Sequence, residues 1–184
     1  MKLEMRTVQK IAAAAMTLAV MFGCASPLKP LAASAAQNTV SVSADIDEEN
    51  SYISAQDQMY QKDFLKLINK ARAKAGLNSV ELGDAAHNAA AAERAEEIAT
   101  VNSHTRPDGS KCFTVLKEYG VTAAPTGENA AWGSVSPQEV VDAWMQSEGH
   151  RANILNPEAR AMGVGYYYNS SSTWGHQWIQ IFTK

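Results

Sequence analysis

The sequence predicts an α+β fold in which helices pack on a small antiparallel sheet. Helical periodicity dominates the chain from residue 58 to about residue 150, whereas the last third holds two segments rich in Val, Ile, Tyr and Trp. These segments, 162–168 and 174–182, are separated by a polar loop, a pattern typical of an antiparallel hairpin. Helices first and paired strands last favour helices stacked on a sheet, and a length of 184 residues suits one such domain.

Two long helices are predicted in the first half of this domain. The first is expected over about 58–75, where Phe64 and Ile68 recur at helical spacing and Gly76 follows as a stop. The second begins after Asp84, a good N-cap residue, and continues to about residue 100. One predicted face of this helix consists of small side chains, so another element must pack very close to it: Ala85, Ala89, Ala92, Ala95 and Ala99.

Two further helices are expected before the strands. A short one over 113–119 ends at Gly120. The sequence 136–139 (Ser-Pro-Gln-Glu) then places Ser at the N-cap, Pro at the first helical position and Glu three residues after the cap, which is a capping box. The helix that follows buries Val140, Val141 and Trp144, and Gly149 is predicted to end it.

The N-terminal 35 residues are predicted to be a signal peptide. Basic residues at positions 2, 6 and 10 precede an apolar run of 13 residues, 11–23, which is short for a membrane span. The small residues 33–35 (Ala-Ser-Ala) fit a cleavage site, so we expect a secreted protein. Lipid anchoring through Cys24 is the alternative. Residues 36–57 are polar and are expected to form a flexible tether to a domain over 58–184.

The charge balance of the secreted part excludes two classes of partner. From residue 36 onward there are 12 basic and 18 acidic residues, a net charge of about −6. Such a chain offers no electrostatic footprint for nucleic acid and no cationic patch for anionic lipid. Only Cys112 remains as a thiol, so no intrachain disulfide can form, and we expect Cys112 to be a small buried hydrophobic residue.

Three polar residues stand out as candidates for chemistry because they are expected in loops at the ends of rigid elements. His104 follows the second helix, Glu128 lies in a Gly-Glu-Asn sequence after a Pro-Thr-Gly turn, and His150 follows Gly149. Two neutral imidazoles and a carboxylate could form the ligand set of a divalent metal such as Zn²⁺. Hydrogen bonding that merely holds the loops together is an equally good interpretation.

Other residues have simpler interpretations. Trp144, Trp178 and Phe182 are expected in the core, whereas His87 and His176 have no partner pattern and are expected at the surface. Ser147 lies close to His150 in the chain, but without an oriented Asp or a nucleophile-elbow pattern it does not indicate a catalytic serine.

Five segments together resemble the CAP superfamily (cysteine-rich secretory protein, antigen 5, pathogenesis-related 1), in its bacterial extracellular type. They are the His104 segment, Gly-Glu-Asn at 127–129, the run 144–156 (Trp-Met-Gln-Ser-Glu-Gly-His-Arg-Ala-Asn-Ile-Leu-Asn), Gly-Val-Gly at 163–165 and 178–182 (Trp-Ile-Gln-Ile-Phe). The resemblance spans nearly all of 59–184 and implies an α-β-α sandwich with a central cleft lined by two histidines and two acidic residues.

Carried over by position, His104, Glu128 and His150 match three of these four cleft residues, and Ser147 stands where a glutamate is typical. The resemblance therefore implies an extracellular binding module with a cleft for a metal ion, a lipid, a polymer or a protein. The alternatives are a metal-dependent hydrolase using the same cleft and a structural component of the cell envelope. No enzyme activity is expected from the residues themselves.

Overall fold

A computed structural model describes residues 43–184, with side chains from residue 55 onward. The expected signal peptide, its cleavage site and Cys24 lie outside the described residues. The elements are, in chain order, α2 (Ser43–Lys74), β1 (Glu81–Leu82), α3 (Ala85–Glu97), α4 (Thr114–Glu118), β2 (Pro125–Trp132), α5 (Pro137–Gln146), α6 (Glu148–Ile154), β3 (Ala161–Asn169) and β4 (Gly175–Thr183).

The four described strands form one sheet in the order β1-β3-β4-β2. The predicted hairpin is confirmed as β3 and β4, which pair antiparallel with Tyr166 opposite Trp178. Strand β2 was not predicted, because its Pro, Gly and Asn residues are poor strand formers. It forms because β4 offers a full antiparallel partner, with Ala130 opposite Ile179. The two-residue β1 adds a parallel pair to β3 at the other edge.

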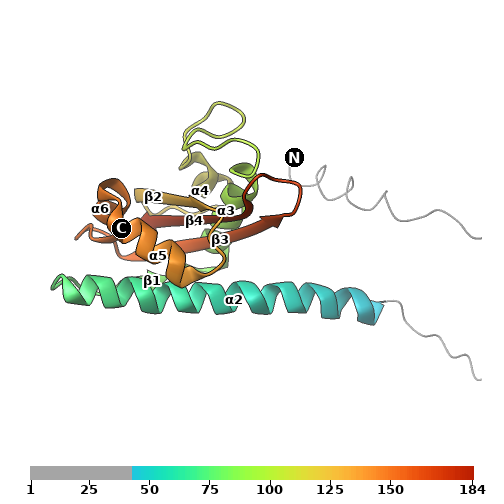
Figure 1. Ribbon diagram of the computed structural model, residues 1–184, viewed down its shortest axis with the longest axis horizontal. Coiled ribbons are helices and arrows are strands. Elements are labelled where there is room, and N and C mark those ends of the chain that lie inside the picture. The colour runs from blue at the N-terminus through green and yellow to red at the C-terminus, as the bar shows by residue number, and fades with distance from the viewer. Residues whose placement is uncertain (1–42) are drawn as a thin grey trace, which may run out of the picture. The chain divides into compact units, whose positions relative to one another are not determined.

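The sheet lies between two helical layers, which confirms the expected α-β-α sandwich (Figure 1). Helices α2, α5 and α6 cover one face, and their core includes Phe64, Trp144, Trp178 and Phe182. Helices α3 and α4 cover the other face, where Ile179 and other small and branched residues are buried. Alternation along β4 sends Trp178 and Phe182 to the first layer and its isoleucines to the second.

Helix α3 packs unusually close to β3, as its many alanines suggested, but through a different face. A Cβ atom added at Gly165 would stand 2.1 Å from the Ala91 carbonyl oxygen. The predicted alanine face was wrong except at Ala95, and the buried residues are His87, Ala90, Ala91, Arg94 and Ala95. Alanines occur on every side of this helix, so composition alone could not select the buried side.

His87 was expected at the surface, and this prediction is wrong. The side chain is 3% exposed, and its Nε2 accepts a hydrogen bond of 3.1 Å from the Gly163 backbone N–H. Because Gly163 has no side chain, the imidazole can lie directly against strand β3. His87 is therefore part of the α3–β3 contact.

The first helix begins earlier than predicted. Helix α2 starts at Ser43, so the segment 43–57, expected to be part of a flexible tether, is helical. No Gly or Pro interrupts the sequence from 43 to 74, and the polar composition that suggested a tether is also compatible with a helix. Among the side chains described from residue 55 onward, Phe64 is the first that is deeply buried.

The capping box that opens α5 is confirmed in its main feature. Ser136 Oγ accepts a hydrogen bond from the Glu139 backbone N–H, and the Glu139 carboxylate accepts one from the Val135 N–H. The predicted end at Gly149 is wrong: α5 ends at Gln146, and Gly149 lies inside α6. Ser147 links the two helices in an extended conformation, which starts a new helical direction.

Candidate functional site

Glu128 is a buried carboxylate in the middle of strand β2, not in a loop as the sequence suggested. His104 Nδ1 lies 2.7 Å from Glu128 Oε1, and Arg94 Nε lies 3.0 Å from Glu128 Oε2. Burial by itself raises the pKa of Glu128, but the hydrogen bonds from His104 and Arg94 outweigh it and lower the pKa below its ordinary value. Glu128 is therefore held as an anion inside the domain.

Arg94, on the buried side of α3, supplies the compensating charge. Its guanidinium is fully buried, and besides Glu128 it donates to the Glu97 carboxylate at 2.6 Å and to the Ser103 carbonyl at 3.0 Å. Glu97 in turn accepts from Arg106, which also pairs with Glu118 at 2.5 Å. The charge network thus runs from the protein interior to the surface, and each buried charge in it has a partner.

His104 connects this network to solvent. Its side chain is 58% exposed, although Nδ1 is held by Glu128. The hydrogen bond to Glu128 raises the pKa of His104 above its ordinary value, and burial and the charge of Arg94 offset part of that effect. The fold therefore fixes the orientation of an exposed imidazole and favours its protonated form.

His150 lies in α6 and faces the same region. Its ring stands 6.3 Å from the ring of Trp144, centroid to centroid. Burial lowers the pKa of His150, and the positive charge of His104 lowers it further. The two histidines are thus near enough to influence each other, and the structure favours imidazolium at His104 and neutral imidazole at His150.

A network of amides fixes α6 against β2. Asn153 donates to the Glu128 carbonyl at 3.1 Å and to the Asn129 side chain at 2.9 Å, and Asn129 donates to the His150 carbonyl at 3.3 Å. A Cβ atom at Gly127 would stand 2.5 Å from Asn153 Oδ1, so this position needs glycine. The Gly-Glu-Asn sequence therefore positions His150 as well as Glu128.

Ser147 lies between α5 and α6, and its side chain is partly buried. Within residues 55–184, no hydrogen bond joins its hydroxyl group to His150. The geometry gives no support for a Ser-His nucleophile at this position.

Cys112 is the site residue that sequence reasoning interpreted only as a hydrophobic side chain. It is 7% exposed, as expected, but its sulfur and the ligand atoms of His104 and Glu128 lie within 4.8 Å of one another. Burial and the neighbouring Glu128 raise the pKa of Cys112 to about 12. The thiol is therefore protonated at neutral pH and is a poor nucleophile.

The donor types of this cluster fit Zn²⁺, but its charge does not fit a preformed metal site. In the metal-free protein the Cys112 thiol holds its proton, and zinc binding would have to release it. Both oxygens of Glu128 already accept hydrogen bonds from Arg94. His150, part of the expected ligand set, is not in the group of three. A zinc ion would therefore have to displace the thiol proton and compete with Arg94 for Glu128.

Arg94 is the functional residue that sequence reasoning missed. Its signal was an arginine on a helix otherwise rich in alanine, where a buried cation requires an anion from another element. That signal could indicate a buried ion pair but could not identify Glu128, which is 34 residues away in the chain.

The fold and the site together define a class: a three-layer α+β domain in which a buried Arg–Glu pair holds an exposed histidine. The model of the cysteine-rich secretory protein family, CAP, matches residues 65–182. The chain therefore belongs to the CAP family, and the resemblance drawn from its five motifs is confirmed.

Two curated relatives come from Bacillus subtilis (strain 168). The uncharacterized protein YkwD is 38% identical over 152 residues, which cover 80% of this chain and 58% of YkwD. The uncharacterized membrane protein YlbC is 33% identical over 115 residues, which cover 57% of this chain and 31% of YlbC. The chain thus spans less than two thirds of either relative.

Solved structures support the fold. An extracellular protein of Bacillus anthracis with an SCP domain is 25% identical, with a TM-score of 0.59 over 67% of this chain and 39% of that one. An outer surface protein of Borrelia burgdorferi is 23% identical, with a TM-score of 0.59 over 70% of this chain and 92% of that one. In the part of the chain described here, no helix has the length and apolarity needed to cross a bilayer.

Proposed function

We propose that this chain is an extracellular binding module whose ligand contacts His104 and His150 at the surface above Glu128. One observation carries the proposal: a buried, charge-compensated carboxylate holds a largely exposed imidazole in a fixed orientation. Preorganised polar groups of this kind bind a ligand without the entropic cost of ordering a mobile side chain. The protonated form of His104 suits an acceptor such as a carboxylate, phosphate or carbonyl oxygen.

The extracellular location is part of this proposal. It is supported by the N-terminal sequence, with its basic start, its apolar run and its small-residue cleavage site. The descriptions of the similar Bacillus anthracis and Borrelia burgdorferi proteins as extracellular and outer surface proteins agree with it. Lipid anchoring through Cys24 remains the alternative route to the same side of the membrane.

The proposal is tested by binding measurements with phospholipid vesicles, sterol-containing vesicles and purified envelope polymer. We expect one of these probes to bind, and we expect His104→Gln and His150→Gln to weaken that binding by about tenfold each. His176→Gln is the matched control, because His176 lies on β4 and bonds to Tyr166. Absence of binding to every probe, or undiminished binding by both the His104→Gln and His150→Gln variants, would contradict the proposal.

A divalent metal is the second candidate ligand of this site, supported by the close grouping of His104, Cys112 and Glu128. Titration of the purified protein with Zn²⁺ tests it, with His104→Gln as the comparison. Stoichiometric binding that is lost in His104→Gln and is accompanied by release of the Cys112 proton would favour the metal centre. Absence of stoichiometric binding, or binding that persists unchanged in His104→Gln, would rule out the metal centre.

A further inference from the structure

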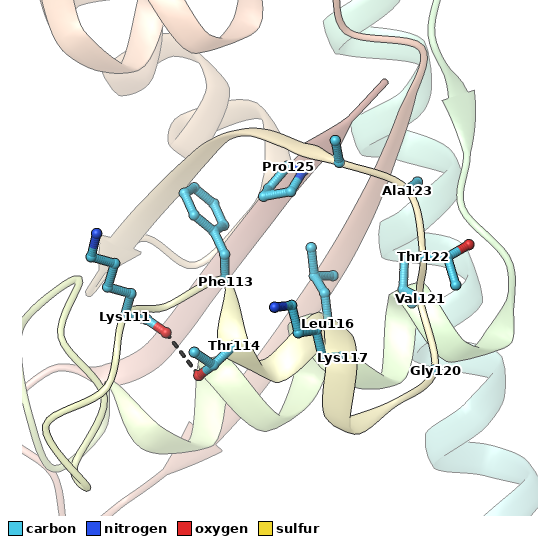
Figure 2. Close-up of a pocket in the computed structure, with 11 residues that line it drawn as sticks. Lys111, Phe113, Thr114, Leu116, Lys117, Gly120, Val121, Thr122, Ala123 and Pro125 are labelled. Carbon is cyan, nitrogen blue, oxygen red and sulfur yellow. Dashed lines mark hydrogen bonds between the residues drawn. The ribbon is translucent and has the colours of Figure 1, made fainter.

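A groove that none of His104, Glu128 and His150 lines lies between α4 and the segment 120–125, which runs beside and above that helix in Figure 2. Its volume is about 650 Å³, within the range typical of small-molecule sites. The chain turns at Gly120, whose φ of 76° is in the left-handed region, and then runs opposite the helix. The groove is therefore formed by one short, continuous stretch of the sequence.

The segment 120–125 contributes mostly small side chains to the lining of the groove. This segment reads Gly-Val-Thr-Ala-Ala-Pro. The opposite side is apolar, with Phe113 half-buried and Leu116 buried (Figure 2). An apolar concavity of this kind gains free energy when an apolar chain replaces water in it.

Two lysines, Lys111 and Lys117, line the same groove, and no acidic residue does. Both side chains are exposed, and within residues 55–184 neither forms an ion pair with a carboxylate. The neighbouring Glu118 does not line the groove and pairs with Arg106. The groove thus combines apolar walls with two exposed lysines, a local basic site that the acidic net charge of the chain did not predict.

We propose that this groove binds a single-chain amphiphile with an anionic head group. The apolar chain lies against Phe113, Leu116 and Val121, and the head group is held by Lys111 and Lys117. Binding needs no covalent step and none of the cleft residues His104, Glu128 or His150, so the inference goes beyond the function proposed above.

Decanoate, kept below its micelle concentration, is the probe, and nitrogen-15 NMR of the full chain is the measurement. We expect saturable 1:1 binding, with amide shifts concentrated in residues 111–125. Decanol and decyltrimethylammonium carry the same chain without the negative charge, and we expect each to bind at least about tenfold more weakly, because both lysine contacts are lost or repulsive.

Two variants address the two parts of the groove. The double variant Lys111→Glu/Lys117→Glu reverses the charge of the groove and should weaken decanoate binding about tenfold or more. The control double variant Lys62→Glu/Lys66→Glu, on exposed positions of α2, should leave the affinity for decanoate within about twofold. Ala123→Trp should fill the groove and abolish binding, and the exposed position of Ala123 should allow this variant to fold. If it does not fold, the variant with both lysines replaced still tests the proposal.

The proposal is overturned if decanoate does not saturate, if the cationic amphiphile binds equally well, or if the shifts map to α2 and α5. Unchanged affinity in the folded lysine double variant also overturns it. His104→Gln should bind decanoate as the wild-type protein does. The groove proposal and the proposed role of His104 and His150 can therefore be refuted independently of each other.

Discussion

Glu128, Arg94 and His104 are three residues whose properties depend on one another. Arg94 makes it possible to bury a carboxylate, the carboxylate fixes and charges His104, and only His104 is substantially exposed. A buried ion pair rarely adds much stability over an apolar pair of the same size, but removal of one partner leaves a costly unpaired charge. We therefore interpret the main role of this cluster as holding the His104 side chain in a fixed orientation.

The variant Glu128→Gln tests this dependence. The pKa of His104 should fall, because the hydrogen bond to the Glu128 carboxylate is the largest cause of its raised value. The free energy of unfolding should fall by about 3 kcal/mol, the lower end for a broken buried pair, since Arg94 keeps Glu97. NMR titration of the histidine rings and chemical denaturation measure the two effects.

Glu118→Gln is the matched control for this variant. The Glu118 side chain is 53% exposed and pairs with Arg106, so its loss should cost less than about 1 kcal/mol. An unchanged pKa of His104 in Glu128→Gln would show that the imidazole is not controlled by the carboxylate.

At the scale of elements, the close approach of α3 to β3 requires two glycines on the strand, Gly163 and Gly165. Gly165→Ala would place a methyl group 2.1 Å from the Ala91 carbonyl oxygen, which belongs to the helix backbone and cannot rotate away. We expect a loss of about 2–3 kcal/mol in the free energy of unfolding. Thermal and urea denaturation measure it.

Gly149→Ala is the matched glycine control for the element scale. Gly149 lies in α6, and a Cβ atom there would meet nothing within 4 Å. Alanine is the better helix former, so this variant should be stabilised by about 0.5–1 kcal/mol. Equal effects at Gly165 and Gly149 would mean that the close packing of α3 does not limit stability.

The start of α3 depends on Asp84, whose Oδ1 accepts the His87 backbone N–H at 2.9 Å. Asp84→Ala should lower the free energy of unfolding by about 1 kcal/mol, because an N-cap acceptor is lost. Asp84→Asn keeps an acceptor and should retain most of the stability. Equal losses in both variants would assign the effect to charge and not to the cap.

At the scale of the whole molecule, two buried groups make the domain sensitive to acid. Burial lowers the pKa of His87, and the Ile181 carbonyl and Asp84 offset this only in part. Protonation would also break the hydrogen bond that His87 Nε2 accepts from Gly163. The stability contributed by neutral His87 is therefore lost as pH falls below about 6.5, its ordinary pKa.

Glu128 acts in the same direction at lower pH, since its pKa is lowered in the folded protein, and the half-buried His150, whose pKa is also lowered, acts in the same direction as His87. His104, with its raised pKa, acts in the opposite direction: its contribution is present at acidic pH and is lost as pH rises through that pKa. We expect the melting temperature to fall between pH 7 and pH 5. His87→Gln should flatten this fall and His176→Gln should not. Identical slopes of melting temperature against pH in the wild-type protein, His87→Gln and His176→Gln would exclude His87 as the cause.

Local sequence signals determined a large part of this protein. The caps at Asp84 and Ser136, the β3–β4 hairpin and the cores around Trp144 and Trp178 follow from side-chain chemistry at short range. The three polar residues His104, Glu128 and His150 could also be selected, because their motifs resemble those of one family. The family model confirms the family assignment, and the role of these three residues stays a prediction.

The tertiary structure alone decided which partners these residues have. Glu128 lies on a strand that local propensity disfavours, and pairing with β4 creates that strand. The buried side of α3, the position of His87 and the pairing of Arg94 with Glu128 all depend on contacts between residues far apart in the chain. Local composition contains no information on such long-range contacts, so the sequence determined which groups were available and the packing determined their charge, orientation and exposure.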